Sequence, residues 1–144
     1  FGSFGRYSIA IAARESYATD IAIQPDGKIL LSAHVDNFNG DFRTGLVRLL
    51  PDGGLDTGFA DGGIASQSIG IGTATTAAVA LQPDGRIVVG GQYRSTVNSR
   101  DFLLLRYLSN GTLDTGFDGD GIVITPFDSG VSSGDRVADI AVQA

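Results

Sequence analysis

The chain has 144 residues, including 21 glycines and no cysteine, and its net charge is −6 at neutral pH. The absence of cysteine excludes disulfides and thiolate metal sites, and no apolar run approaches the roughly 18–20 residues of a membrane-spanning helix. The acidic balance, without a basic cluster, argues against nucleic acid or an anionic membrane as a partner. Asp supplies 15 of the 16 acidic residues and Lys only one of the 10 basic ones. Since Asp and Gly favour turns, whereas Glu and Lys favour helix surfaces, the composition predicts an all-β protein with many tight turns.

The sequence repeats itself at a spacing of 58 residues. Gln24–Ile29 (QPDGKI) returns as Gln82–Ile87 (QPDGRI), and Gly53–Phe59 (GGLDTGF) returns as Gly111–Phe117 (GTLDTGF). Self-similarity at a fixed period of this size is typical of repeat architectures such as propellers and solenoids.

The period divides the chain into two full repeats and half of a third. Repeat 1 covers residues 1–58, repeat 2 covers 59–116, and 117–144 form the first half of repeat 3, in which Asp139–Gln143 (DIAVQ) resembles Asp20–Gln24 (DIAIQ). We interpret the repeats as blades of one propeller domain that is truncated at both ends, because the chain begins in a crossing between repeats and ends inside a hairpin. We therefore expect the chain to be an excerpt of a longer polypeptide.

Each repeat contains four strand-like segments. In repeat 2 they are residues 63–69, 75–82, 86–92 and 101–108. The last three carry nearly continuous apolar runs, which are typical of strands covered on both faces of their sheet. A four-stranded antiparallel sheet that is covered on both faces and recurs at a fixed period predicts the blades of a β-propeller, about two and a half of them here.

A Pro-Asp-Gly turn joins the second and third segments of each repeat. Asp26 and Gly27 form it in repeat 1, and Asp84 and Gly85 form it in repeat 2. Pro presets φ for the first central position, Asp tolerates the next, and Gly supplies the left-handed residue. We expect a tight hairpin at both places.

The motifs of the repeat resemble those of the bacterial delta-60 repeat, which occurs in tandem in large secreted or surface-exposed proteins. The resemblance rests on Asp20–Ile29, Ala80–Gly90, Asp101–Tyr107 (DFLLLRY), Leu55–Phe59 and Leu113–Phe117. It implies propeller blades and export to the periplasm, the cell surface or the medium. It implies no catalytic residue set.

Charged residues also keep their places in the repeat. Arg48 and Arg106 lie in the fourth segment, and Asp56 and Asp114 lie in the Gly-rich crossing that follows it. An Arg between apolar neighbours is costly to bury unless it is paired. We therefore predict one structural ion pair per repeat, Arg48 with Asp56 and Arg106 with Asp114. The repeated positions interpreted as structural are Asp26, Gly27, Asp84, Gly85, Arg48, Arg106, Asp56, Asp114, Phe59 and Phe117.

Asp118 and Asp120 are the candidates for a metal site. Asp118-Gly119-Asp120-Gly121 resembles the opening of a calcium loop, because Ca²⁺ takes hard oxygen ligands on Gly-rich turns. No Glu closes the loop at the spacing of an EF-hand, and the crossing before repeat 2 does not keep both carboxylates. We prefer a turn role and predict no cofactor or metal, with calcium at these two residues as the alternative.

No set of side chains stands out as catalytic. His34, the sole histidine, has Gln92 as its counterpart in repeat 2, and we expect it at the surface or at a strand end. No Gly-x-Ser-x-Gly elbow accompanies it. Tyr17, Tyr93 and Tyr107 are candidates for a glycan-binding surface. The Gly90-Gly91 pair predicts a bend or a close approach between sheets.

The sequence therefore predicts a non-enzymatic β-propeller segment of an exported bacterial protein, used for structure or for protein–protein contact. Its partners would be other protein chains or the remaining blades of the same polypeptide. The alternative is a ligand-binding, glycan-binding or hydrolytic propeller with its site in the central channel, in blades outside this chain. We expect the first segment of each repeat, residues 64–69 and 121–125, to line that channel, and they carry no acid, base or His.

Overall fold

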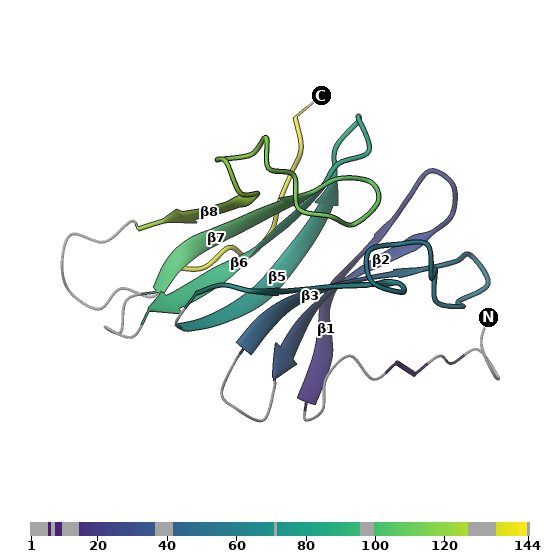
Figure 1. Cartoon of the computed structure of the whole chain (residues 1–144), viewed down its shortest axis with the longest axis horizontal. Helices are drawn as coiled ribbons and strands as arrows, with labels where there is room; N and C mark the ends of the chain where they lie inside the picture. Colours follow the sequence, from purple (N-terminus) through teal and green to yellow (C-terminus); the bar gives the residue numbers. More distant parts are fainter. Residues whose placement is uncertain are drawn as a thin grey trace.

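The computed structural model of the chain describes residues 6, 8–9, 15–36, 42–70, 72–95, 100–126 and 135–143. This part of the chain folds into β-strands and turns, so the predicted all-β class is confirmed (Figure 1). None of these residues forms a helix long and apolar enough to cross a membrane. The strands are β1 (Glu15–Ile23), β2 (Ile29–Asp36), β3 (Phe42–Leu49), β4 (Ile64–Ser68), β5 (Gly72–Leu81), β6 (Ile87–Ser95), β7 (Arg100–Tyr107) and β8 (Ile122–Thr125).

Antiparallel pairing groups the strands into two four-stranded sheets. The first, β1–β2–β3–β4, is called the first blade, and the second, β5–β6–β7–β8, is called the second blade. One parallel pair, Phe42 with Thr73, links them. β5 packs across β1, β2 and β3, so the two sheets lie against each other like neighbouring blades of a propeller (Figure 1).

The sheets are offset from the sequence repeats. β4 belongs to repeat 2 but pairs with β3 of repeat 1, where Leu46 lies opposite Ala65. β8 belongs to repeat 3 but pairs with β7, where Leu104 lies opposite Val123. Each blade therefore takes three strands from one repeat and its fourth strand from the next.

This offset decides which edge of each blade faces the axis. β1 packs against β5, and Thr19 Oγ1 lies 2.9 Å from Thr76 Oγ1, whereas β4 and β8 occupy the opposite edges of their sheets. The expectation that residues 64–69 and 121–125 line the central channel is therefore wrong. The chain returns after each Gly-rich crossing to the outer edge of the blade that it has just left, so β1 and β5 are the inner strands.

A β-bulge recurs in the inner strands at the repeat spacing. The register shifts between Ala18 and Asp20 in β1 and between Thr76 and Ala78 in β5. Beyond the bulge, the Val79 N–H of the second blade donates a hydrogen bond of 2.8 Å to Asp20 Oδ2 of the first. A carboxylate of one blade thus satisfies a backbone donor of the next, which fixes the two inner strands relative to each other.

The hydrophobic core lies between the two blades. Alternate residues of β2 and β3 face alternate residues of β6 and β7, and the Phe59 ring from the crossing after β3 joins them. All of these side chains are at most 2% exposed, so the junction is packed like a protein interior. The principal members are Leu30, Leu46, Phe59, Ile87, Val89, Leu103, Leu105 and Tyr107.

Residues 135–143 run along the far face of the second blade without forming a regular strand. The Val137 N–H donates a hydrogen bond of 3.4 Å to Gly91 O. A Cβ atom at Gly90 would lie 2.7 Å from Ile140 Cδ1 and 2.9 Å from Val137 Cγ1. Residues 135–143 of the third repeat therefore approach β6 closely at Gly90 (Figure 1), whereas the sequence predicts a bend or a close approach between sheets.

Candidate functional site

The two Pro-Asp-Gly turns have the expected geometry. Gly27 and Gly85 adopt φ values of 82° and 84°, in the left-handed region that favours glycine. Asp26 Oδ1 and Asp84 Oδ1 each accept a hydrogen bond from the backbone N–H two residues on, at 3.1 Å and 3.0 Å. These four residues shape the hairpins β1–β2 and β5–β6.

The predicted ion pair of repeat 1 is part of a larger cluster. Arg48 Nε lies 2.8 Å from Asp56 Oδ2, and Lys28 Nζ, from the turn after β1, lies 3.2 Å from the same oxygen. The Arg48 guanidinium carbon also sits 4.3 Å from the centroid of the Phe59 ring. The Asp56 carboxylate is thus held between two cations, one of which stacks on an aromatic ring.

Repeat 2 builds the same cluster with one substitution. Arg106 Nε and Arg86 Nε lie 2.8 Å and 2.9 Å from Asp114 Oδ2, so Arg86 takes the place of the lysine. Arg86 also pairs with Asp84 in its own turn. The Arg106 guanidinium carbon lies 4.5 Å from the centroid of the Phe117 ring. The predicted pairing of Arg106 with Asp114 is therefore present as well.

Both cluster carboxyls have pKa values below the usual range. Burial alone would raise the pKa of Asp56, but hydrogen bonds from Lys28 and Arg48 outweigh it. Burial likewise opposes the shift at Asp114, where the Gly116 N–H and the two arginines lower the pKa. Both carboxylates are ionised at neutral pH and are bound by cations of their own repeat. We therefore interpret them as groups that stabilise the fold.

The first cluster also joins the two blades. Arg48 Nη1 donates a hydrogen bond of 2.7 Å to Ser109 O, in the turn after β7. In the same turn Gly111 has a φ of 89°, and a Cβ atom there would lie 2.7 Å from Phe59 Cζ. The turn after β7 therefore docks on the Arg48–Phe59 stack at the end of the junction.

The calcium candidates take part in a turn. Asp118 adopts a φ of 52°, and Asp120 Oδ1 accepts a hydrogen bond of 2.8 Å from the Ile122 N–H at the start of β8. Within the ranges that the structure describes, no group of three or more His, Asp or Glu side chains gathers as a metal would require. Asp118 thus takes part in the turn through its backbone conformation, and Asp120 through a side-chain hydrogen bond to the backbone.

His34 lies near the end of β2, which is one of its two predicted positions, but it is buried. It is 7% exposed, two residues before the end of β2, and its ring lies 5.1 Å from that of Tyr17 and 5.5 Å from that of Phe42. The expectation of a surface position is wrong, because two aromatic rings of the neighbouring strands cover the imidazole. The tyrosines do not form one surface: Tyr17 is exposed on β1, Tyr93 is half-buried on β6 and Tyr107 is buried on β7.

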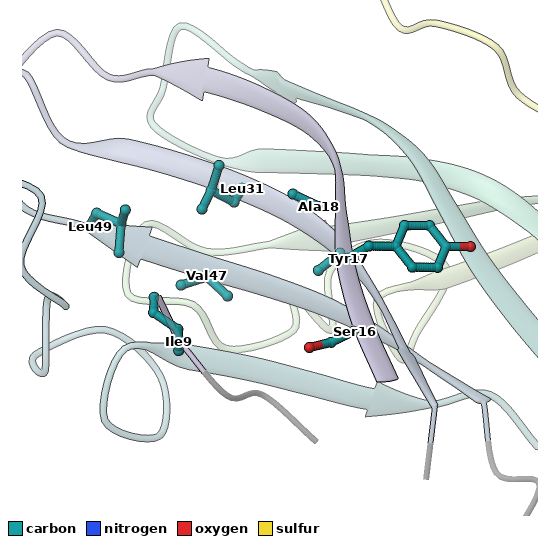
Figure 2. A pocket seen from close by; sticks show the side chains of 8 residues that line it. Ile9, Ser16, Tyr17, Ala18, Leu31, Val47 and Leu49 are labelled. Atoms are coloured by element: carbon teal, nitrogen blue, oxygen red, sulfur yellow. The ribbon is translucent and has the colours of Figure 1, made fainter. Parts of the chain in front are cut away.

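The face of the first blade that points away from the junction is apolar and partly open. A cavity of about 150 Å³ lies on it, and Figure 2 shows Ile9 facing Val47 and Leu49 across that cavity. Beside it β1 exposes Ile21 and Ile23 at 56% and 61%. The residues that line the cavity are Ile9, Ser16, Tyr17, Ala18, Leu31, Ala33, Val47 and Leu49.

In the second blade, the equivalent face is covered by the first blade. Val79 of β5 stands at the repeat position of Ile21 and is 7% exposed, because it packs against the first blade. Val89 of β6 stands at the position of Leu31 and is 1% exposed. No signal in the sequence points to this face as a site, since periodicity alone does not distinguish a covered strand from an open one. We take the open face, with the exposed residues of β1, as the candidate interaction surface.

Comparison with known proteins supports the repeat architecture. No curated protein matches the chain. The sequence profile of a family described as "domain of unknown function (DUF5122) beta-propeller" matches residues 24–59 and 82–117. Both stretches run from the glutamine before the Pro-Asp-Gly turn to the phenylalanine under the stacked arginine, so they contain the whole ion-pair cluster. Because the two matches together cover half of its length, the chain belongs to this family of β-propeller domains.

Proposed function

We propose that the chain is a non-enzymatic structural segment of a β-propeller that binds further blades, in the same polypeptide or in another chain. The observation that carries the proposal is the unequal burial of equivalent strands. Ile21 is 56% exposed on β1, whereas Val79 at the same repeat position is 7% exposed on β5. On this face the first blade thus exposes apolar side chains along β1 at positions that the neighbouring blade covers on β5, whereas Val47 and Leu49 of β3 are already 1% and 5% exposed.

The assignment of the charged residues supports a structural role. Asp56 and Asp114, which occupy equivalent positions in the two repeats, are both bound by cations of the same repeat. A general acid or base needs a proton-transferring oxygen that can reach a substrate. These carboxylates instead hold the crossings against the strands, in both blades alike.

The proposed origin is an exported bacterial protein built from delta-60 repeats. The period of 58 residues, the Gln-Pro-Asp-Gly turns and the Asp-Phe-Leu-Leu-Leu-Arg-Tyr strand support it. Because the chain has no cysteine, it forms no disulfides, and its covalent structure is the same in an oxidising compartment. Export is tested by cell fractionation with an antibody against these repeats, and a signal confined to the cytoplasm would contradict it.

Sedimentation velocity of the 144-residue chain tests the interaction surface. We expect concentration-dependent association that Ile21→Asp weakens about tenfold or more, because a charge would be buried in an apolar contact. Leu108→Asp is the matched control, since Leu108 is 36% exposed in the turn after β7, away from the open face. A chain that stays monomeric, or equal losses in the two variants, would contradict the proposal.

A further inference from the structure

The outer face of the second blade repeats the surface that the first blade presents to the junction. Leu103 and Leu105 point into the junction, so Leu104 between them lies on the opposite side of β7, which we call the receiving face. At the junction, the apolar residues of the first blade are fully buried, and they include Leu30, Leu46 and Phe59. Their counterparts 58 residues on lie on the receiving face and are only half-buried, namely Val88, Leu104 and Phe117.

The receiving face also repeats the stack on which a turn docks. Arg106 stacks on Phe117 as Arg48 stacks on Phe59, at 4.5 Å and 4.3 Å. The Arg48 side chain is 9% exposed, because the turn after β7 covers it and Ser109 O accepts its hydrogen bond. The Arg106 side chain is 22% exposed, and within the described part of the chain it has no contact of this kind. The second stack is therefore free to receive a turn.

The turn after β3 has the form of the turn that docks at the junction. Gly53 and Gly111 adopt φ values of 88° and 89°, and each N–H donates a hydrogen bond of 2.9 Å, to Leu50 O and Leu108 O respectively. The turn after β7 docks on the blade that precedes its own. The turn after β3 is built alike, so it is directed in the same way, beyond the open face of the first blade.

The chain thus carries both sides of its own junction a second time, one at each end of the blade pair. We propose that the open face of the first blade binds the receiving face of a second copy of the chain, head to tail. This proposal rests on the proposed function, because it uses the same open face and names its partner. Ile21 of one copy would take the place on the receiving face that Val79 takes on the first blade. A contact between unlike faces leaves one of each free, so it builds rings or filaments.

Residues 135–143 hold the place that β1 of the second copy would take. Asp139–Gln143 (DIAVQ) differs from Asp20–Gln24 (DIAIQ) at one position. The segment forms no regular strand, and its backbone hydrogen bonds to β7 and β6 are long, at 3.3 Å and 3.4 Å. β1, in contrast, is anchored in a hairpin with β2. We therefore expect β1 of the second copy to displace the segment.

Mixing two complementary variants in sedimentation velocity tests the head-to-tail contact. Ile21→Asp disables the open face and Leu104→Asp disables the receiving face, so each variant alone should associate about tenfold or more weakly than the parent chain. A 1:1 mixture should form a heterodimer and nothing larger, because each variant keeps one intact face. Circular dichroism checks the fold, and Val123→Asp, opposite Leu104 on β8, replaces Leu104→Asp if that variant unfolds.

The outcomes separate this proposal from the proposed function. If Ile21→Asp loses association but Leu104→Asp and Val123→Asp keep it, the open face still binds a partner, and the receiving face is overturned as that partner. A mixture that stays monomeric would also overturn the head-to-tail contact. If Ile21→Asp itself has no effect, both proposals are wrong. Leu108→Asp remains the control, since its counterpart Leu50 lies outside the junction core.

A substitution in the covering segment tests the displacement. Ile140 packs on Gly90, so Ile140→Asp should loosen residues 135–143 and strengthen association of the full chain about tenfold. Ala141→Asp introduces the same charge at an exposed neighbour and should leave association unchanged. Weaker association of Ile140→Asp would show that the segment belongs to the contact, and the displacement would be overturned.

Discussion

The junction between the two blades and the open face of the first blade are made from the same repeat positions but have different environments. Ile87 of β6 is fully buried at the junction, whereas Ile29, at the equivalent position of β2, is half-buried on the open side. The strands, turns and ion pairs around the two residues are alike. The comparison shows that the repeat specifies a blade, and that the neighbouring blade determines what the side chains of its faces contribute to stability.

The largest expected effect comes from truncating the two equivalent isoleucines. Ile87→Ala should lower the free energy of unfolding by about 4 kcal/mol, because it leaves a cavity in the packed junction, and Ile29→Ala by about 2 kcal/mol or less. Urea unfolding followed by circular dichroism measures both. Equal losses would show that the open face is as tightly packed as the junction.

Two glycines have the same backbone conformation, but only one of them lies at the contact between the blades. Gly111 and Gly119 have φ values of 89° and 90°, but a Cβ atom would meet Phe59 only at Gly111 and nothing within 4 Å at Gly119. Gly111→Ala should therefore cost about 3 kcal/mol, and Gly119→Ala about 1 kcal/mol, which is the cost of the left-handed backbone alone. Thermal and urea unfolding measure the difference, and similar values would place the turn after β7 away from the Phe59 ring.

Two aspartates at equivalent positions of the repeat differ in whether they bind the neighbouring blade. Asp20 accepts hydrogen bonds from the Ile21 N–H of its own strand and from the Val79 N–H of the next blade, whereas Asp139 accepts one from the Ile140 N–H beside it. Asp20→Ala should cost about 2 kcal/mol, because it leaves a donor of the junction without its charged acceptor, and Asp139→Ala about 1 kcal/mol or less. A larger loss at Asp139 would contradict the role of Asp20 between the blades.

The smallest effect concerns the response to alkaline pH. Burial raises the pKa of Tyr107 to about 12, above the value of about 10 in an unfolded chain. The neutral phenol therefore stabilises the fold fully below about pH 10, and this contribution is lost as the pH rises from about 10 towards 12. Urea midpoints at several alkaline pH values should fall less in Tyr107→Phe than in the parent chain.

Tyr17→Phe is the matched control for the alkaline series, because Tyr17 is 52% exposed on β1. Its replacement should leave the pH profile of the parent chain unchanged. A Tyr107→Phe profile that matches the parent instead would mean that the junction admits solvent to the phenol.

Much of each blade could be predicted from the sequence, because the relevant interactions are local. The Pro-Asp-Gly turns depend on neighbouring residues, and the pairs Arg48–Asp56 and Arg106–Asp114 each join positions eight residues apart along one crossing. Their partners Lys28 and Arg86 were not predicted, because they reach the carboxylates from another hairpin.

The period, the strands, the turns and the charged pairs follow from the amino-acid sequence alone, since each depends on contacts within one repeat. The tertiary structure was needed to show that the strand of residues 64–68 completes the preceding blade, that β1 and β5 face the axis, and that His34 is buried under two aromatic rings. The physical reason is that blade packing joins residues about one repeat apart, and a repeated pattern is the same whichever neighbour a strand pairs with.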